Sequence, residues 1–140
     1  MIRISKENDL ENLVRIWLDA SIMAHDFIPA HYWEGKVTDM RTVYLPASKV
    51  HVYEIGTTIV GFIAMVDDYI AALFVDPIRQ GQGVGKKLID FVKNEHPVLR
   101  LGVYAKNTKS IGFYKKQGFM ITGTKEEENT GEMETTMQWV

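Results

Sequence analysis

The chain has 140 residues, of which 46% are hydrophobic and 24% charged, and it contains no cysteine. This length and composition are typical of one globular domain, so we expect residues 1–140 to form a single domain without disordered tracts. The formal net charge of -2 argues against binding to nucleic acid or an anionic membrane, and the missing cysteine excludes disulfides, a thiolate nucleophile and cysteine-ligated metal.

The sequence predicts a cytoplasmic protein that does not bind membranes. No apolar run approaches the ~18 residues of a membrane span. Charged residues follow Met1–Ser5 directly, where a signal peptide would carry an apolar core. The absence of cysteine fits a reducing compartment.

The first third of the chain is predicted to be helical after a short strand at Ile2–Ile4. Hydrophobic residues between positions 10 and 18 recur at the spacing of one helix face. Pro29 disfavours helix at the residue before it, so this helix should end shortly before that proline. A second helix is expected from about Ala30 to Tyr44, after a polar and aromatic loop.

The middle of the chain is predicted to be β-sheet. Val50–Ile55 and Thr58–Val66 are rich in β-branched and aromatic residues and flank a Gly56-Thr57 turn, which predicts a hairpin. Alternation along the first of these strands predicts that His51 is half exposed. The almost uninterrupted apolar run Tyr69–Val75 predicts a central strand that is buried on both faces.

The last third alternates helices and strands. A helix follows a glycine-rich loop and should end at His96-Pro97. A strand at Leu99–Tyr104 precedes a helix that Asn107 caps and that runs through Lys116. Further strands are expected from Phe119 and over residues 133–140. The whole series predicts an α/β (α+β) fold in which a mixed sheet is covered by helices.

The glycine-rich loop is the strongest chemical signal. In Gln80-Gly81-Gln82-Gly83-Val84-Gly85, glycines permit tight turns, and the following helix directs unpaired N–H groups and its positive dipole end toward the loop. These features predict a cradle for a phosphate or pyrophosphate, although the same glycines also suit a simple strand-to-helix connection. Lys87 stands where a P-loop requires a hydroxyl, and glycines two apart do not fit the dinucleotide-binding fingerprint.

The loop and a later segment resemble two motifs of the Gcn5-related N-acetyltransferase (GNAT) family. The loop, preceded by Arg79, is similar to the family's Gln/Arg-x-x-Gly-x-Gly/Ala motif. Asn107, Phe113-Tyr114 and Gly118-Phe119 match its Asn...Ala/Ser-x-x-Phe-Tyr-x-x-x-Gly-Phe segment. With the matching order of elements, the resemblance to small bacterial single-domain members covers essentially the whole chain. It implies a GNAT-type acyl-CoA N-acyltransferase fold with a mixed, mostly antiparallel, seven-stranded sheet and about four helices.

The resemblance implies an N-acetyltransferase that moves the acetyl group of acetyl-CoA to a primary amine of a small molecule, peptide or protein, by direct attack in a ternary complex. Tyr114 would protonate the departing CoA thiolate, and its alternative role is packing. The strands ending at Val75 and Tyr104 would splay apart and pair with pantetheine, and a backbone N–H near Phe74 and Val75 would meet the oxyanion. The implied cofactor contacts are Phe74, Val75, Gln80, Gly81, Gln82, Gly83, Val84, Gly85, Lys86, Asn107 and Tyr114.

The acceptor amine must lose a proton before it attacks, because an alkyl amine has a pKa of about 10.4. The family fixes no single base position, and many of its members use a chain of waters. The candidate bases in this sequence are His25, Asp26, His31, Glu34, Glu54, Asp68 and backbone carbonyls near Tyr69. The stretch from His25 to Ile28 ranks first, because that region borders the acceptor channel in similar proteins, while simple capping of the first helix is the alternative. The expected substrate contacts are His25, Asp26, Phe27, Tyr32 and Tyr69.

The sequence is also compatible with two functions other than catalysis. The scattered histidines have no metal-ligand spacing, so no metal site is predicted. A catalytically silent acyl-CoA-binding sensor, or an interaction domain without a small ligand, would also fit the loop, although the intact Phe113-Tyr114 pair argues against the sensor. Similar proteins form dimers through their last strands, which makes a homodimer a further expectation.

Overall fold

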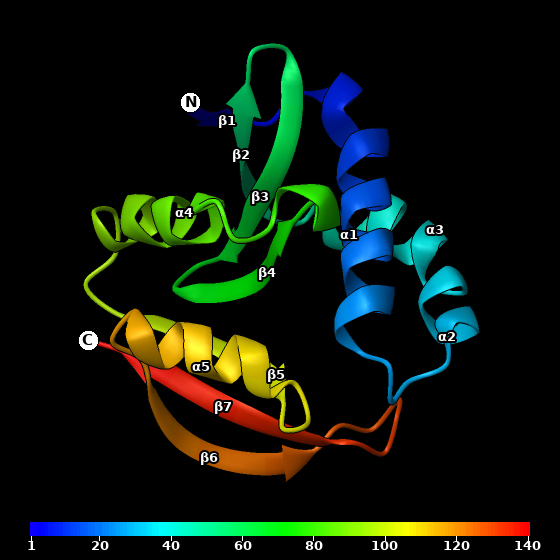
Figure 1. Ribbon diagram of the computed structural model, residues 1–140, viewed down its shortest axis with the longest axis vertical. Helices are drawn as coiled ribbons and strands as arrows, with labels where there is room; N and C mark the ends of the chain where they lie inside the picture. Colours follow the sequence, from blue (N-terminus) through cyan, green and yellow to red (C-terminus); the bar gives the residue numbers. More distant parts are fainter.

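The computed structural model describes all 140 residues, which form a seven-stranded sheet with helices on both faces (Figure 1). The strand order is β1-β2-β3-β4-β5-β7-β6, and every neighbouring pair is antiparallel except β4 and β5. The strands are β1 Ile2–Ile4, β2 Lys49–Ile55, β3 Thr58–Val66, β4 Tyr69–Val75, β5 Leu99–Tyr104, β6 Met120–Glu126 and β7 Met133–Trp139. The predicted mixed, mostly antiparallel sheet is confirmed.

The α-helices group on two sides of the sheet, with α1 to α3 together on one side of the molecule and α4 and α5 on the other (Figure 1). They are α1 Leu10–Ala24, α2 Ala30–Glu34, α3 Val37–Asp39, α4 Val84–Lys93 and α5 Thr108–Lys116. Short 3-10 turns cover Glu7–Asp9 and Pro77–Arg79. No helix combines the length and the apolar composition that a membrane crossing requires.

Each face of the sheet carries its own hydrophobic core. Phe62, Ala64 and Ala72 pack with α1 on one face, whereas Ile63 and Ile70 pack with α4 on the other. Along β3 this division follows from the alternation of side chains. In β4 an extra residue, Ala71, interrupts the pairing with β3, so that Ile70 and Ala72 point to opposite faces although they are two residues apart. The sheet therefore holds both helix layers in place and fixes where α1 and α4 end relative to its strands.

The predicted single helix from Ala30 to Tyr44 is wrong. α2 ends at Glu34 and α3 is one short turn. Residues Met40–Tyr44 form a π-helical turn in which the Leu45 N–H donates to the Met40 carbonyl at 3.1 Å. Met40 and Leu45 are both buried. A five-residue turn places both side chains against the core, which a regular helix with 3.6 residues per turn would not do.

The prediction that β4 is buried on both faces is also wrong. Ile70 and Ala72 are buried, but Tyr69 and Ala71 are exposed. The cause is the neighbouring strand, because β5 pairs with β4 at one position only and then diverges. His51 departs from its prediction in the opposite direction: it is buried, because the Phe91 ring of α4 lies 4.6 Å from its own.

Candidate active site

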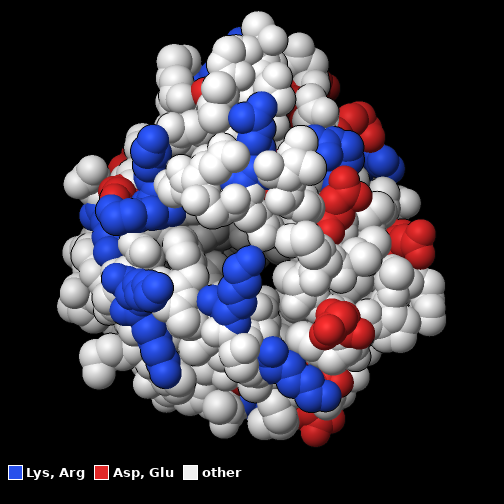
Figure 2. Space-filling model, in the orientation of Figure 1, with Lys and Arg blue, Asp and Glu red and all other residues white.

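A cleft opens where β4 and β5 separate. The two strands share a single Cα pair, Tyr69 with Arg100, and the residues that follow on each strand line a cleft of about 1180 Å³. The splay expected for these strands is therefore present. Figure 2 shows the hollow near the centre of this face, with Lys and Arg gathered mainly on the side of α4 and α5.

The glycine-rich loop reaches the cleft at the first turn of α4. Gly81 and Gly83 have φ values of +80° and +81°, a left-handed conformation that favours glycine, and Gly83 is the N-cap residue of α4. The backbone N–H groups of residues 81–86 make no hydrogen bond within the protein. A set of free N–H groups at a helix start can hold an anion, so the loop has the properties of a phosphate cradle as well as of a tight connection.

The side chains around this loop hold its shape. The Gln80 amide donates to the Val75 carbonyl at 3.3 Å, and the buried Asp76 carboxylate accepts from the Ile78 N–H and from Arg15 of α1 at 2.9 Å. Lys86 pairs with Asp90 at 2.6 Å on the exposed face of α4. Gly85 serves packing, because a Cβ there would lie 3.2 Å from the Phe113 ring of α5.

Tyr114 of α5 lies on the wall of the cleft. Its half-buried ring packs on Phe113 and Phe119 at centroid distances of 5.3 and 5.5 Å, and its hydroxyl makes no hydrogen bond within the protein. Burial raises the pKa of Tyr114, and the nearby Tyr69 phenol acts in the same direction. The hydroxyl therefore stays protonated at neutral pH and is a free donor toward the cleft.

Asn107 connects the start of α5 to the end of α1. Its Oδ1 accepts from the Ser110 N–H at 3.2 Å, which confirms the predicted N-cap, and its Nδ2 lies 3.4 Å from His25 Nε2. His25 Nδ1 lies 2.9 Å from the Ser21 carbonyl. These contacts fit a neutral imidazole with its proton on Nδ1, and burial lowers the pKa of His25 while the Ser21 contact opposes that shift.

The structure places these candidate bases where they are already paired, exposed to solvent or outside the cavities. Both ring nitrogens of His25 have partners, and its ring stacks on Trp33 with centroids 5.0 Å apart. Asp26 is exposed and lines neither of the two main cavities. Glu54 and Asp68 each pair with an arginine, which lowers the pKa of each carboxyl, and Glu34 is exposed on α2. The favoured stretch thus contributes aromatic walls instead of a free base.

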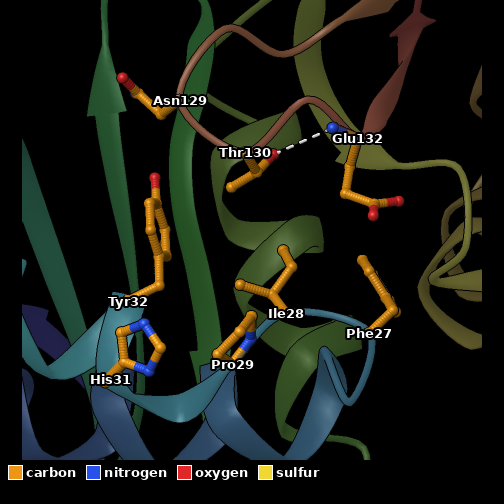
Figure 3. Close-up of a pocket in the computed structure, with 8 residues that line it drawn as sticks. All are labelled: Phe27, Ile28, Pro29, His31, Tyr32, Asn129, Thr130 and Glu132. Atoms are coloured by element: carbon orange, nitrogen blue, oxygen red, sulfur yellow. Dashed lines mark hydrogen bonds between the residues drawn. The ribbon is translucent and has the colours of Figure 1, made fainter.

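A smaller cavity of about 210 Å³ adjoins the cleft between the α1–α2 loop and the β6–β7 turn. Figure 3 shows Phe27 and Tyr32 on one side, facing Glu132 and Asn129 on the other. Tyr32 and Asn129 line both cavities. The predicted substrate residues Phe27, Tyr32 and Tyr69 therefore lie along connected space: Phe27 lines the smaller cavity, Tyr69 lines the cleft, and Tyr32 lines both.

Several residues of the cleft, among them Ala71 and Glu134, were not found from the sequence. Ala71 is an extra residue between the pairs Ala64–Ala72 and Met65–Ile70, so it forms a bulge that leaves its backbone unpaired. Glu134 of β7 pairs with Tyr104 of β5, and its carboxylate lies beside Gly102 and lines the cleft. No local pattern could have revealed these positions, because each depends on the register of two paired strands.

The comparisons with known proteins agree with this fold. A family model described as an acetyltransferase (GNAT) domain matches residues 21–140. The chain therefore belongs to the GNAT family and is an N-acetyltransferase.

Individual relatives resemble nearly the whole chain. It is 34% identical to the peptidyl-lysine N-acetyltransferase YiaC of Escherichia coli over 99% of this chain and 96% of YiaC. The solution structure of apo YjaB from Escherichia coli superposes with a TM-score of 0.88 at 31% identity, covering 100% of this chain and 97% of that one. PaiA N-acetyltransferase from Thermoplasma acidophilum, solved in complex with coenzyme A, shares the fold at 18% identity with a TM-score of 0.81, over 99% and 97% of the two chains.

Proposed function

We propose that this enzyme transfers the acetyl group of acetyl-CoA to the side-chain amine of lysine in peptides or proteins. The observation that carries the proposal is the cleft between β4 and β5, which leads from the free N–H groups at α4 to the Tyr114 hydroxyl. The name of the relative YiaC supports lysine as the acceptor.

In this proposal the donor lies along the cleft. The N–H groups of residues 81–86 hold its diphosphate, and the glycines leave them accessible because nothing lies within 4 Å of a Cβ at Gly81 or Gly83. The unpaired edges of β4 and β5 hold pantetheine by backbone hydrogen bonds, with Phe74 and Val75 beside it. Asn107 and the basic side chains Lys86 and Lys109 add polar contacts.

Catalysis needs three actions from the protein. Binding both substrates together brings the amine to the thioester carbon and makes the attack effectively unimolecular. A backbone N–H at the Ala71 bulge, or at Phe74 and Val75 further along β4, stabilises the oxyanion. The acceptor first loses a proton to solvent and attacks as the neutral amine. The C–N bond forms and the C–S bond breaks, the Tyr114 hydroxyl gives its proton to the sulfur, the nitrogen releases its second proton to solvent, and Tyr114 regains a proton from solvent. The expected homodimer is part of the proposal, since β6 is an edge strand with Met120 and Ile121 exposed.

The test is a transfer assay with acetyl-CoA. Lysine peptides, the same peptides with arginine in place of lysine, and free polyamines are incubated with the enzyme, and products are located by mass spectrometry. We expect acetylation at lysine Nε and none in the arginine peptides. Transfer to polyamines alone would contradict the peptide acceptor, and binding of acetyl-CoA without transfer to any amine would identify a sensor.

A further inference from the structure

We propose that Glu134 of β7 recognises the acceptor amine as a cation inside the cleft. The inference rests on the proposed function, because it requires a lysine side chain to enter between β4 and β5. It adds the residue that selects an alkylammonium group over an uncharged chain of the same length. The argument uses the position of the carboxylate, its partners and its charge.

The position of Glu134 depends on a glycine. A Cβ built on Gly102 would stand 2.9 Å from Glu134 Cδ and 3.0 and 3.1 Å from the two carboxylate oxygens. The carboxylate therefore occupies the space that any side chain at position 102 would take. Gly102 lies two residues beyond Arg100, the last β5 residue paired with β4, so this space belongs to the opening part of the cleft.

The Glu134 carboxylate is directed toward the cleft, and only a small part of it is exposed to solvent. The Glu134 side chain is 20% exposed, and Tyr69 and Tyr104 line the cleft with it. Burial raises the pKa of Tyr69, and the charge of Glu134 is the next contribution to that shift. A negative charge that acts on a phenol of β4 is turned toward the space between the two strands.

Glu134 is also less engaged than the other carboxylates nearby. Its only ion-pair partner is Lys125 of the edge strand β6, at 3.5 Å and 65% exposed, and such a pair stabilises little. Glu127, the other acidic residue of the cleft, accepts from the Thr130 N–H and hydroxyl at 2.7 and 2.9 Å. Glu132 pairs with Lys106 at 3.1 Å. Glu134 accepts no hydrogen bond and is free for a ligand.

The chemistry of the acceptor calls for such a group. With a pKa of about 10.4, lysine reaches the enzyme almost entirely as an ammonium ion. An ammonium ion that leaves water for a cleft lined mostly by hydrophobic side chains requires a counter-charge or a hydrogen-bond acceptor. Glu134 supplies both, through charge-assisted hydrogen bonds of the strong class.

The test measures binding without turnover. The protein is saturated with CoA, which cannot transfer an acetyl group, and titrated by calorimetry with a lysine peptide and with the same peptide carrying norleucine. A charge-assisted hydrogen bond predicts that the wild-type complex prefers lysine by about tenfold or more. The preference should fall below about twofold in Glu134→Gln, with CoA affinity unchanged. Glu126→Gln, on the exposed face of β6, is the matched control and should keep the wild-type preference.

A second variant tests position instead of charge. Gly102→Ala keeps the carboxylate but forces it from its place, so it should also reduce the preference for lysine. An undiminished preference in Glu134→Gln would overturn the inference while transfer by the wild-type enzyme leaves the proposed function intact. If the CoA-loaded wild-type protein binds neither peptide, and the wild-type protein supplied with acetyl-CoA does not acetylate the lysine peptide, both proposals are wrong.

Discussion

The Tyr114 side chain combines packing and a free donor in one residue. Its ring is held between Phe113 and Phe119, while its hydroxyl has no partner in the protein. Tyr114 can therefore serve both in packing and as a general acid, because the ring makes the packing contacts and the hydroxyl carries the proton. Only the hydroxyl is available for chemistry, so removing it should separate the two roles.

Replacement of Tyr114 by Phe should lower kcat by about 10²–10⁴, because the leaving thiolate loses its proton donor. The Kd of CoA and the melting temperature should change little, since the ring contacts are retained. Steady-state kinetics and calorimetry measure both quantities. Tyr53→Phe is the control, because the Tyr53 hydroxyl contacts Lys87 on the surface. Full activity in Tyr114→Phe would exclude it as the acid.

His25 should make the stability of the fold sensitive to acid. Its folded pKa lies below its ordinary value of 6.5, chiefly because of burial, so the unfolded chain binds the proton more readily. Its contribution to stability is complete above about pH 6.5 and is lost as the pH falls toward the folded pKa. Urea unfolding at about pH 7.5 and about pH 5.5 should show a smaller acid loss in His25→Asn than in the wild type. Equal losses would contradict this assignment.

The residues that the sequence could predict are those with local partners. Asn107 caps its own helix through Ser110, three residues away. Tyr114 lies in that same helix, within the short sequence motif from which its role was predicted. Glu134 lies beside Gly102 only because β5 and β7 pair in one register. The contact of Asn107 with His25 likewise joins residues 82 positions apart. Such partners depend on tertiary packing, which periodicity does not encode.

At the scale of elements, α4 and the loop before it form one unit. The left-handed Gly83 ends the loop and begins the helix, so the free N–H groups share one orientation. The sequence could predict which of these segments form strands and which form helices, because glycine spacing and apolar periodicity are properties of neighbouring residues in the chain. The break after α2 and the exposure of Ala71 were not predictable, because they depend on burial of Met40 and on the divergence of β5.

The glycine at position 83 can be tested by alanine. A residue with a Cβ in the left-handed conformation should lower the free energy of unfolding by about 1–2 kcal/mol. The same change should weaken CoA binding by about tenfold, which corresponds to 1.4 kcal/mol, by moving the N–H groups. Chemical unfolding and calorimetry measure these effects.

A helical glycine elsewhere provides the control. Gly112 of α5 has open space around its Cβ position and lies in a helix, so Gly112→Ala should stabilise the protein by about 0.5–1 kcal/mol and leave CoA binding unchanged. Equal CoA affinity in Gly83→Ala and the wild type would argue that the loop is only a connection.

At the scale of the whole molecule, the sheet consists of two parts joined at one point. Strands β1 to β4 form one part, and β5, β7 and β6 form the other. Tyr69 and Arg100 are the one residue pair by which β4 and β5 join the two parts. The mixed architecture was predictable from the order of elements, since a resemblance over the whole chain fixes topology. A ligand that pairs with both edges should join the two parts.

CoA should therefore raise the melting temperature. A ligand at a concentration of about 100 times its Kd contributes about 2.7 kcal/mol, which corresponds to a rise of about 5–10 °C for a domain of this size. Differential scanning calorimetry with CoA and acetyl-CoA measures the shift, and Gly83→Ala at the same ligand concentration should show a smaller one. No shift in the wild type would contradict the binding of CoA.

Because β4 and β5 separate, each of these two central strands has one side without a paired strand, like a strand at the edge of a sheet. Central strands normally exchange their amide hydrogens slowly, because both sides are paired. Here residues 71–75 and 101–104 face each other across the cleft, so amides directed into it should exchange rapidly with deuterated water. Slowly exchanging amides should flank this fast stripe in β3 and β7, and uniform protection across the sheet would contradict the expectation. Slowly and rapidly exchanging amides would then lie side by side in the middle of one sheet.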